Sequence, residues 1–312
     1  MIKTALERIA RIGRAGTPES ALGNELGQKL AQLRSRGYVM FDHLVGSPGM
    51  EMLKADYIDR LENQLQFEMP TLAQTRVDPE RDADMIAKNF LADNQELAAR
   101  GLTFDRSDVQ TYAQVVTDFE PSTLKVYLPD TTPWMQMWLD PKVLAVTEAY
   151  MGFRPELTEA YLRRNYPSKF VVMNHAWHRD RNHPTHLLKA FYFLSDCTLK
   201  TGPHHYIAGS IQNRALDGKP YFTNEEVAAT YTGPDTEEIV SVVPAGTIIL
   251  EDTRGLHKAG IPEEGYRDLG FATFLPPIAL RKREALYHVS HGTVSGLNDQ
   301  QRAYIPAGNI TQ

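Results

Sequence analysis

The second half of the chain is divided into short segments rich in β-branched and aromatic residues, each followed by residues that favour turns. The expected strands cover residues 157–166, 169–177, 187–195, 238–243, 247–251 and 267–275. The breaks between them fall at Pro203, Gly209, Pro234, Gly246 and Gly260. Several short strands at this spacing favour a β-sandwich or barrel over a helical fold.

The first half shows mainly helical periodicity, with apolar residues three and four positions apart. The expected helices cover residues 2–12, 19–33, 48–67, 82–99 and 134–151, and Tyr38–Phe41 reads as a strand after Gly37. We see no internal repeat and no low-complexity linker. The sequence therefore predicts a single domain (1–312), with a mostly helical part (1–154), a β core (155–280) and a polar tail (281–312). The tail is compatible with a closing arm, a subunit contact or a mobile segment.

Composition excludes several classes of protein. The chain has 312 residues and a formal net charge of −6, with basic residues scattered along it, so we expect no nucleic-acid partner. No apolar run is long enough to cross a bilayer, and the N-terminus lacks the apolar stretch of a secretory signal. Cys197 is the only cysteine, so an intramolecular disulfide is impossible and a reducing cytoplasm is expected. Oligomeric state stays open.

The segment from Asn174 to Asp180 carries a potential metal site. Alternate residues on a strand point to the same side, so His178 and Asp180 are expected to share a face with Asn174. An imidazole and a carboxylate placed in this way can bind one cation together. A histidine and an aspartate at this spacing are nevertheless common, and taken alone they more often have structural roles.

A third ligand is expected at His257, which follows the strand predicted at 247–251. Two histidines and one carboxylate form a facial triad, which leaves coordination positions open on iron(II) for a co-substrate and oxygen. Other histidines crowd the same region. His183, in the loop after the first two ligands, lies either at a pocket mouth or in solvent.

Arg267 follows His257 by ten positions and opens a predicted strand. On that strand Arg267, Leu269, Phe271 and Thr273 share a face. A guanidinium there can hold the distal carboxylate of 2-oxoglutarate, because its planar fork matches a carboxylate. Alone, such an arginine is more often a surface or ion-pair residue, and it is the two spacings together that favour the functional interpretation.

These segments resemble the phytanoyl-CoA dioxygenase family of iron(II) and 2-oxoglutarate-dependent oxygenases. The matching motifs are Trp177-His178-Arg179-Asp180, Phe193-Leu194-Ser195-Asp196, Gly202-Pro203, Ala208-Gly209-Ser210, His257 and Arg267. The resemblance spans residues 30–275 and is specific between 174 and 275. Two positions depart from the family pattern: Ile211 stands where a histidine is usual and Ala208 where a proline is usual. Because Asp180 is intact, the related halogenases, which replace that carboxylate, are disfavoured.

The resemblance implies a double-stranded β-helix (jelly-roll) core with helices packed outside it. It also implies iron(II) on His178, Asp180 and His257, which would be both metal ligands and catalytic centre, with ascorbate as an added stimulant. The co-substrate 2-oxoglutarate would be held by Arg267, with further contacts from Asn174 and Thr273. A substrate pocket is expected around Tyr161, Arg163, Lys189 and His183, although strand packing or, for Lys189, a surface position explains these residues equally well.

The expected function is oxidation of an unactivated C–H bond, with a small biosynthetic metabolite and molecular oxygen as partners. Hydroxylation, desaturation, cyclisation and epimerisation all stay open. Two alternatives are kept. One is a cupin-type iron dioxygenase without 2-oxoglutarate, against which Arg267 argues. The other is a jelly-roll binding protein with a vestigial metal site.

Overall fold

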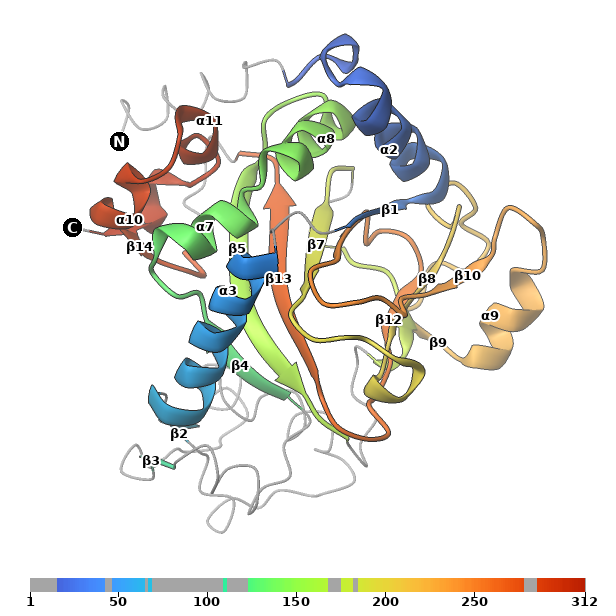
Figure 1. The fold of residues 1–312 in the computed structure, drawn as a ribbon. Coiled ribbons are helices and arrows are strands. Elements are labelled where there is room, and N and C mark those ends of the chain that lie inside the picture. Colours follow the sequence, from blue (N-terminus) through green and yellow to red (C-terminus); the bar gives the residue numbers. More distant parts are fainter. Residues whose placement is uncertain are drawn as a thin grey trace.

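Two antiparallel sheets form the core of the protein (Figure 1). The computed structural model describes residues 16–42, 47–64, 67–68, 109–110, 123–167, 175–181, 185–277 and 285–311. The larger sheet has the order β1 (Tyr38–Phe41), β11 (Ile248–Glu251), β7 (Leu188–Phe193), β13 (Arg267–Leu275), β5 (Glu156–Asn165) and β4 (Thr123–Tyr127). The smaller has the order β10 (Glu238–Val240), β8 (His204–Ile207), β12 (His257–Ala259), β6 (Trp177–His178) and β9 (Tyr221–Phe222).

This arrangement is a jelly-roll with added helices, and it confirms the fold class predicted from the sequence. The expected strand at 267–275 coincides with β13, and four others lie within a few residues of β5, β7, β10 and β11. Most of the expected strand at 169–177 lies outside the described residues, as do the expected helices at 2–12 and 82–99.

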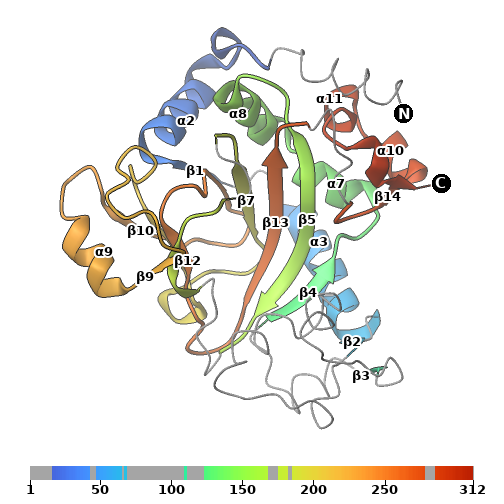
Figure 2. The same ribbon diagram turned by 180° about the vertical axis from the view of Figure 1, so that it is seen from behind.

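Helices cover the outer face of the larger sheet (Figure 2). They are η1 (Glu19–Ala21), α2 (Gly23–Arg36), α3 (Ser47–Asp59) continued by η2 (Arg60–Gln64), α7 (Thr132–Trp138) and α8 (Pro141–Met151). Gly37 ends α2 in the left-handed conformation, at φ 85°, and so allows the chain to turn directly into β1. The end of α2 at Gly37 and the strand that follows it both agree with the sequence prediction.

The single helix predicted at 134–151 is wrong, because the chain breaks it into α7 and α8. Pro141 has no N–H to continue the hydrogen-bond ladder of α7, so a new helix begins there. The Asp140 carboxylate caps that new helix by accepting from the backbone N–H groups of Lys142 and Val143. The first half also contributes β4, a strand that the helical pattern concealed.

The described part of the tail, residues 285–311, is packed against the core. It contains β14 (Val289–Ser290), α10 (His291–Ser295), α11 (Asp299–Arg302), η6 (Ala307–Asn309) and β15 (Ile310–Thr311). Tyr287 and Tyr304 are buried, and both bond to the backbone of Leu157 in β5, at 3.0 and 2.9 Å. Of the three readings left open for the tail, a mobile segment is therefore excluded for these residues.

The remaining described elements are small. They are η5 (Leu199–Thr201), α9 (Asn224–Thr230) and the pair β2 (Phe67–Glu68) and β3 (Val109–Gln110). A second apolar cluster around Trp177, Phe222 and Val227 packs α9 against the smaller sheet. Among the described residues, no helix has the length and apolar character to cross a membrane.

Alternate side chains of β13 point to opposite sides of the larger sheet, one covered by helices and the other facing the smaller sheet. Gly270, Ala272 and Phe274 face the helices, and the Trp138 ring packs so closely on Gly270 that a side-chain carbon there would lie 2.1 Å from it. Leu269 and Phe271 face the space between the sheets, as the period of a strand requires. The functional residues discussed below occupy this inner face.

A buried ion pair anchors the outer face at Asp268. Arg164 of β5 makes two parallel bonds to the Asp268 carboxylate, each of 2.8 Å, and Tyr57 donates a third at 3.2 Å. Both charged side chains are almost completely buried. Such a pair stabilises the fold only while both partners are present, because a lone buried charge is costly.

We therefore expect Asp268→Asn to lower the free energy of unfolding by about 3 kcal/mol. In a domain of this size that corresponds to a fall in Tm of roughly 5 °C, measured by calorimetry. The double variant Arg164→Met with Asp268→Leu removes both charges and is expected to regain much of this loss. An Asp268→Asn variant with wild-type Tm would contradict the assignment.

Candidate metal centre

Three predicted ligands converge on one point between the two sheets. His178 and His257 are paired opposite each other on β6 and β12, and their ring centroids are 4.2 Å apart. Asp180 follows β6, where its backbone N–H donates to the Thr253 carbonyl at 2.9 Å. One nitrogen or oxygen atom from each of the three side chains lies within 4.8 Å of the others. The histidine Nε2 atoms are 3.9 Å (His178) and 3.7 Å (His257) from the Asp180 oxygens.

Backbone carbonyls orient both imidazoles. Nδ1 of His178 donates to the Ala176 carbonyl at 2.9 Å, and Nδ1 of His257 donates to the Gly255 carbonyl at 3.0 Å. A carbonyl can only accept, so each ring carries its proton on Nδ1 and has a free lone pair on Nε2. The Nε2 atoms are the ones that face Asp180, which is the arrangement that metal-binding histidines need.

The surroundings keep the three groups in their metal-binding protonation states. Burial lowers the pKa of His178, and it lowers the pKa of His257 to about 3, helped by the neighbouring His178. Burial would raise the pKa of Asp180, but the adjacent Lys189 ammonium, together with His257 and Thr253, outweighs it, so the pKa of Asp180 lies well below its usual value. At neutral pH the site presents two neutral imidazoles and one carboxylate, which suits a divalent cation.

Among the described residues, Lys189 of β7 is the cation in direct contact with this cluster. Its Nζ lies 2.6 Å from Asp180 Oδ2 and 5.1 Å from the centroid of the Phe271 ring, and its side chain is mostly buried. The structure thus places Lys189 on the inner face rather than on the surface. Its ammonium competes with any metal ion for the charge of Asp180.

Lys189→Met is therefore expected to tighten divalent-metal binding about tenfold, equivalent to about 1.4 kcal/mol. Methionine keeps much of the side-chain volume while it removes the charge. Anaerobic titration with iron(II), read by calorimetry, measures the change, with Lys200→Met as a surface control. Weaker binding in Lys189→Met would show instead that the lysine is needed to orient Asp180.

A cavity of about 380 Å³ opens beside the metal cluster. It is lined by Glu159, Tyr161, Arg163, His178, Asp180, Lys189, Phe191, His204, His257, Ala259 and Phe271. Three predicted pocket residues, Tyr161, Arg163 and Lys189, are part of this wall. Phe271 lies between them: Tyr161 stacks on it at 5.0 Å, and the Arg163 guanidinium lies 5.6 Å from its ring centroid. The wall therefore combines aromatic surface with cationic groups.

Arg267 lies further along the inner face, outside the cavity lining. It is buried, and Nη2 makes a long bond of 3.4 Å to Asn165. Its Nε and Nη1 atoms are also buried and have no hydrogen-bond acceptor among the described residues. Burial, and then the nearby Arg163, lower the pKa of Arg267 to about 10, so it remains charged at neutral pH. A buried guanidinium with two unused donors is ready to receive an anion.

The other predicted contacts divide into two groups. Thr273 is buried and donates to Glu159 at 3.0 Å, so it reaches the cavity wall through a residue that lines it. Asn174 and His183 lie outside the described residues.

A second buried polar pair, His204 with Glu251, lies in the interior and was not predicted from the sequence. His204 Nε2 lies 2.9 Å from Glu251 Oε2, and both side chains are buried. Burial raises the pKa of Glu251 and lowers that of His204, so the interior opposes charge on both partners. Glu251 ends an apolar strand, and a carboxylate on the inner face of such a strand is the signal that could have identified it.

Comparison with solved structures finds the same fold in other proteins, including SnoN and EctD. The non-heme alpha ketoglutarate dependent epimerase SnoN from nogalamycin biosynthesis is 14% identical, with a TM-score of 0.51, covering 80% of this chain and 82% of SnoN. EctD from S. alaskensis, in its apoform, is also 14% identical at a TM-score of 0.51, covering 88% of this chain and 84% of EctD. No family model matches the chain, and no curated protein matches it. At this level of identity the likenesses establish the shared fold.

Proposed function

We propose that this protein is a non-haem iron(II) and 2-oxoglutarate-dependent oxygenase, related to the phytanoyl-CoA dioxygenase family, that oxidises an unactivated C–H bond of a small biosynthetic metabolite. The observation that carries the proposal is the cluster of His178, Asp180 and His257 inside a jelly-roll. Two imidazoles with free Nε2 lone pairs and one ionised carboxylate match the donor set of iron(II) oxygenases.

The inner face also suits a dicarboxylic co-substrate. In Arg267 the buried Nε and Nη1 atoms have no acceptor among the described residues, and a carboxylate would bond in parallel to one of them and to Nη2, whose bond to Asn165 is long at 3.4 Å. This favours a 2-oxoglutarate enzyme over a cupin-type dioxygenase that uses no keto acid. SnoN, which shares the fold, is described as alpha ketoglutarate dependent.

When bound, iron(II) with 2-oxoglutarate would supply oxidising power from dioxygen, with succinate and carbon dioxide as products. The residues of this chain do the remaining work. His178 and His257 hold their rings through backbone carbonyls, so the ligand geometry is set before metal arrives. Phe191 and Phe271 supply the aromatic part of the cavity wall, and Arg163 and Lys189 offer charge to orient a substrate.

The proposal covers hydroxylation and the related outcomes that the same oxidant permits. SnoN is described as an epimerase from a biosynthetic pathway, which supports a small biosynthetic metabolite as substrate class. Small-molecule substrate and molecular oxygen are therefore the proposed partners, and ascorbate is a proposed stimulant.

An anaerobic absorption spectrum tests the proposal. Protein mixed with iron(II) and 2-oxoglutarate is expected to develop the visible band of the iron–keto acid chelate, absent when either is omitted. Oxygen should then release succinate. Iron binding without a band, together with oxygen uptake that ignores 2-oxoglutarate, would favour the cupin-type alternative. Failure to bind iron(II) would favour a binding protein.

A further inference from the structure

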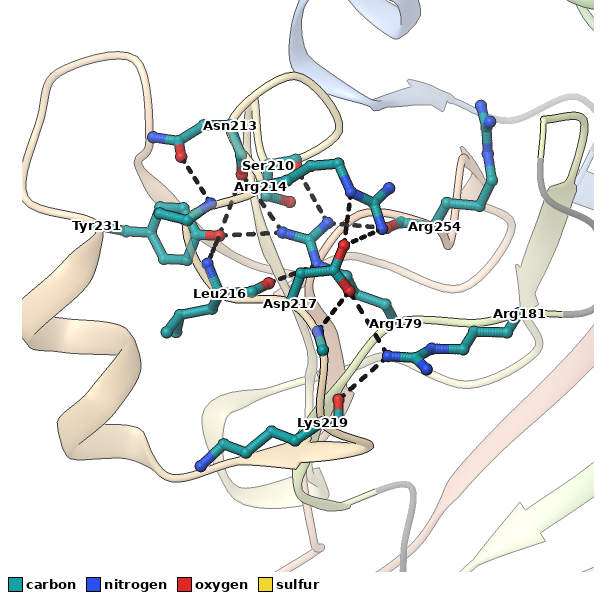
Figure 3. A network of polar contacts seen from close by, with 12 residues as sticks. Arg179, Arg181, Ser210, Asn213, Arg214, Leu216, Asp217, Lys219, Tyr231 and Arg254 are labelled. Carbon is teal, nitrogen blue, oxygen red and sulfur yellow. Dashed lines mark hydrogen bonds and ion pairs between the residues drawn. The ribbon is translucent and has the colours of Figure 1, made fainter.

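Arg179, between the two predicted ligands His178 and Asp180, is buried with its charge not neutralised (Figure 3). A guanidinium has five N–H donors, and all are used here, but every acceptor is neutral. The acceptors are the carbonyls of Ser210, Asn213, Leu216 and Arg254 and the hydroxyl of Tyr231. Arg179 therefore ties the 210–216 loop to the metal-binding segment and brings a positive charge that no described carboxylate pairs with.

Further arginines surround an open cleft beside Arg179. The cleft has a volume of about 750 Å³ and is lined by Arg179, Asp180, Arg181, Arg214, Asp217, Gly218 and Arg254. Four of these seven residues are arginines, although the whole chain carries a net charge of −6. The cleft is therefore a local concentration of positive charge rather than part of a generally basic surface.

Asp217 is shared by the two exposed arginines of the cleft. Arg214 Nε donates to its Oδ2 at 2.8 Å, and Arg181 Nη2 lies 3.5 Å from its Oδ1. The side chains of Arg181 and Arg214 are 60% and 49% exposed, so both can reach a ligand. Arg254 differs, because it pairs with the fully buried Asp252. The two exposed guanidinium groups thus share one exposed carboxylate. With the buried Arg179 added, the cleft has excess positive charge.

Asp180 connects this cleft to the metal centre. It lines the cleft, and it also lines the interior cavity that contains His178 and His257. A molecule whose anionic end lies among the arginines is thus placed next to a metal ligand.

We propose that this arginine cleft binds the phosphate or carboxylate group of an anionic substrate and directs the rest of that molecule towards the metal centre. The proposal rests on the proposed oxygenase function and names its substrate class. Arg181 and Arg214 are the recognition residues, because their exposed planar forks match the oxygens of either group. Arg179 and Arg254 instead shape the cleft from behind.

Binding of simple oxyanions to the metal-free protein tests the proposal. Inorganic phosphate and citrate are titrated into the wild type and into the double variant Arg181→Gln with Arg214→Gln, followed by calorimetry. At least one probe is expected to bind the wild type and to bind the double variant at least tenfold more weakly. Tighter binding of inorganic phosphate would indicate a phosphate substrate, and tighter binding of citrate would indicate a carboxylate substrate. Exposed ion pairs contribute little to stability, so the double variant should remain folded.

A matched control removes two exposed cations elsewhere. Lys200→Gln with Arg302→Gln changes the net charge equally, and both residues sit in exposed ion pairs. This control should bind the probes like the wild type. Equal weakening in both double variants, or no binding of either probe to the wild type, would overturn the proposal.

The spectrum with iron(II) and 2-oxoglutarate separates this inference from the function on which it rests. Both double variants should form the visible band as the wild type does, because neither removes a predicted ligand or Arg267. A band without oxyanion binding overturns the cleft assignment alone. A wild type that forms no band overturns the oxygenase proposal and, with it, the substrate role of the cleft.

Discussion

Replacing Asp180 with alanine is expected to abolish iron-dependent succinate formation and to weaken iron(II) binding by more than about 100-fold. Losing a partner that only supports a ligand typically costs 10–100-fold in metal affinity, so losing a ligand itself should exceed that range. The variant also leaves the mostly buried Lys189 ammonium beside two imidazoles without its closest carboxylate, 2.6 Å away in the wild type. That charge further repels a divalent cation.

The fold should persist in Asp180→Ala. The contact that places this segment is the backbone bond from Asp180 N–H to the Thr253 carbonyl, which alanine retains. Circular dichroism checks that the fold persists, and anaerobic titration with iron(II) checks that metal binding is weakened. Asp196→Ala, which removes an exposed carboxylate that accepts from the Ala245 backbone N–H, is the control. Normal turnover by Asp180→Ala would remove this residue from the ligand set.

Replacing Arg267 with methionine is expected to have effects of opposite sign on co-substrate binding and on stability. Loss of a buried charge pair costs about 2–5 kcal/mol, so the concentration of 2-oxoglutarate required should rise by roughly 30-fold or more. In the free protein, however, the Arg267 guanidinium is buried with two unused donors. Removing it should raise the free energy of unfolding by about 1–2 kcal/mol.

Titration of the visible band with 2-oxoglutarate measures the first effect, and a melting curve without ligand measures the second. The neighbouring Asp268→Asn provides the contrast, because it should destabilise the fold while leaving the 2-oxoglutarate requirement unchanged. An Arg267→Met variant with an unchanged requirement would place the carboxylate anchor elsewhere. A fall in its Tm would mean that Arg267 has a structural partner.

The elements that the sequence predicts best are those in which local pattern and burial agree. All nine residues of β13 are buried, and their composition and bounding turns mark the strand correctly at both ends. The 134–151 prediction failed because apolar periodicity continued across Asp140 and Pro141, while the local chemistry of those two residues ended one helix and started another. The strands β8 and β12 begin with polar residues, as HHYI and HKA, and so lack an apolar pattern that predicts a strand. Their pairing with each other is seen only in the folded chain.

In the candidate metal centre, too, some residues can be predicted from the sequence and others cannot. Strand alternation places His178 and Asp180 on one side, and spacing suggests His257 and Arg267, so four of the principal residues can be named from the sequence. The ion pair of Lys189 with Asp180 and the buried pair of His204 with Glu251 cannot, because each joins segments that meet only in the folded chain.

The sequence alone indicated a β-sandwich or barrel and named His178, Asp180 and His257 as predicted ligands of one metal ion, because alternation and short-range spacing are local properties of the chain. Only the tertiary structure decided what surrounds them: which cations neutralise Asp180, which donors of Arg267 remain unused, and how Arg179, Arg214 and Arg254 gather at one cleft. Charges and polar groups act across a few ångströms of space, and residues such as Arg179 and Arg254, 75 positions apart, reach that distance only when the chain folds.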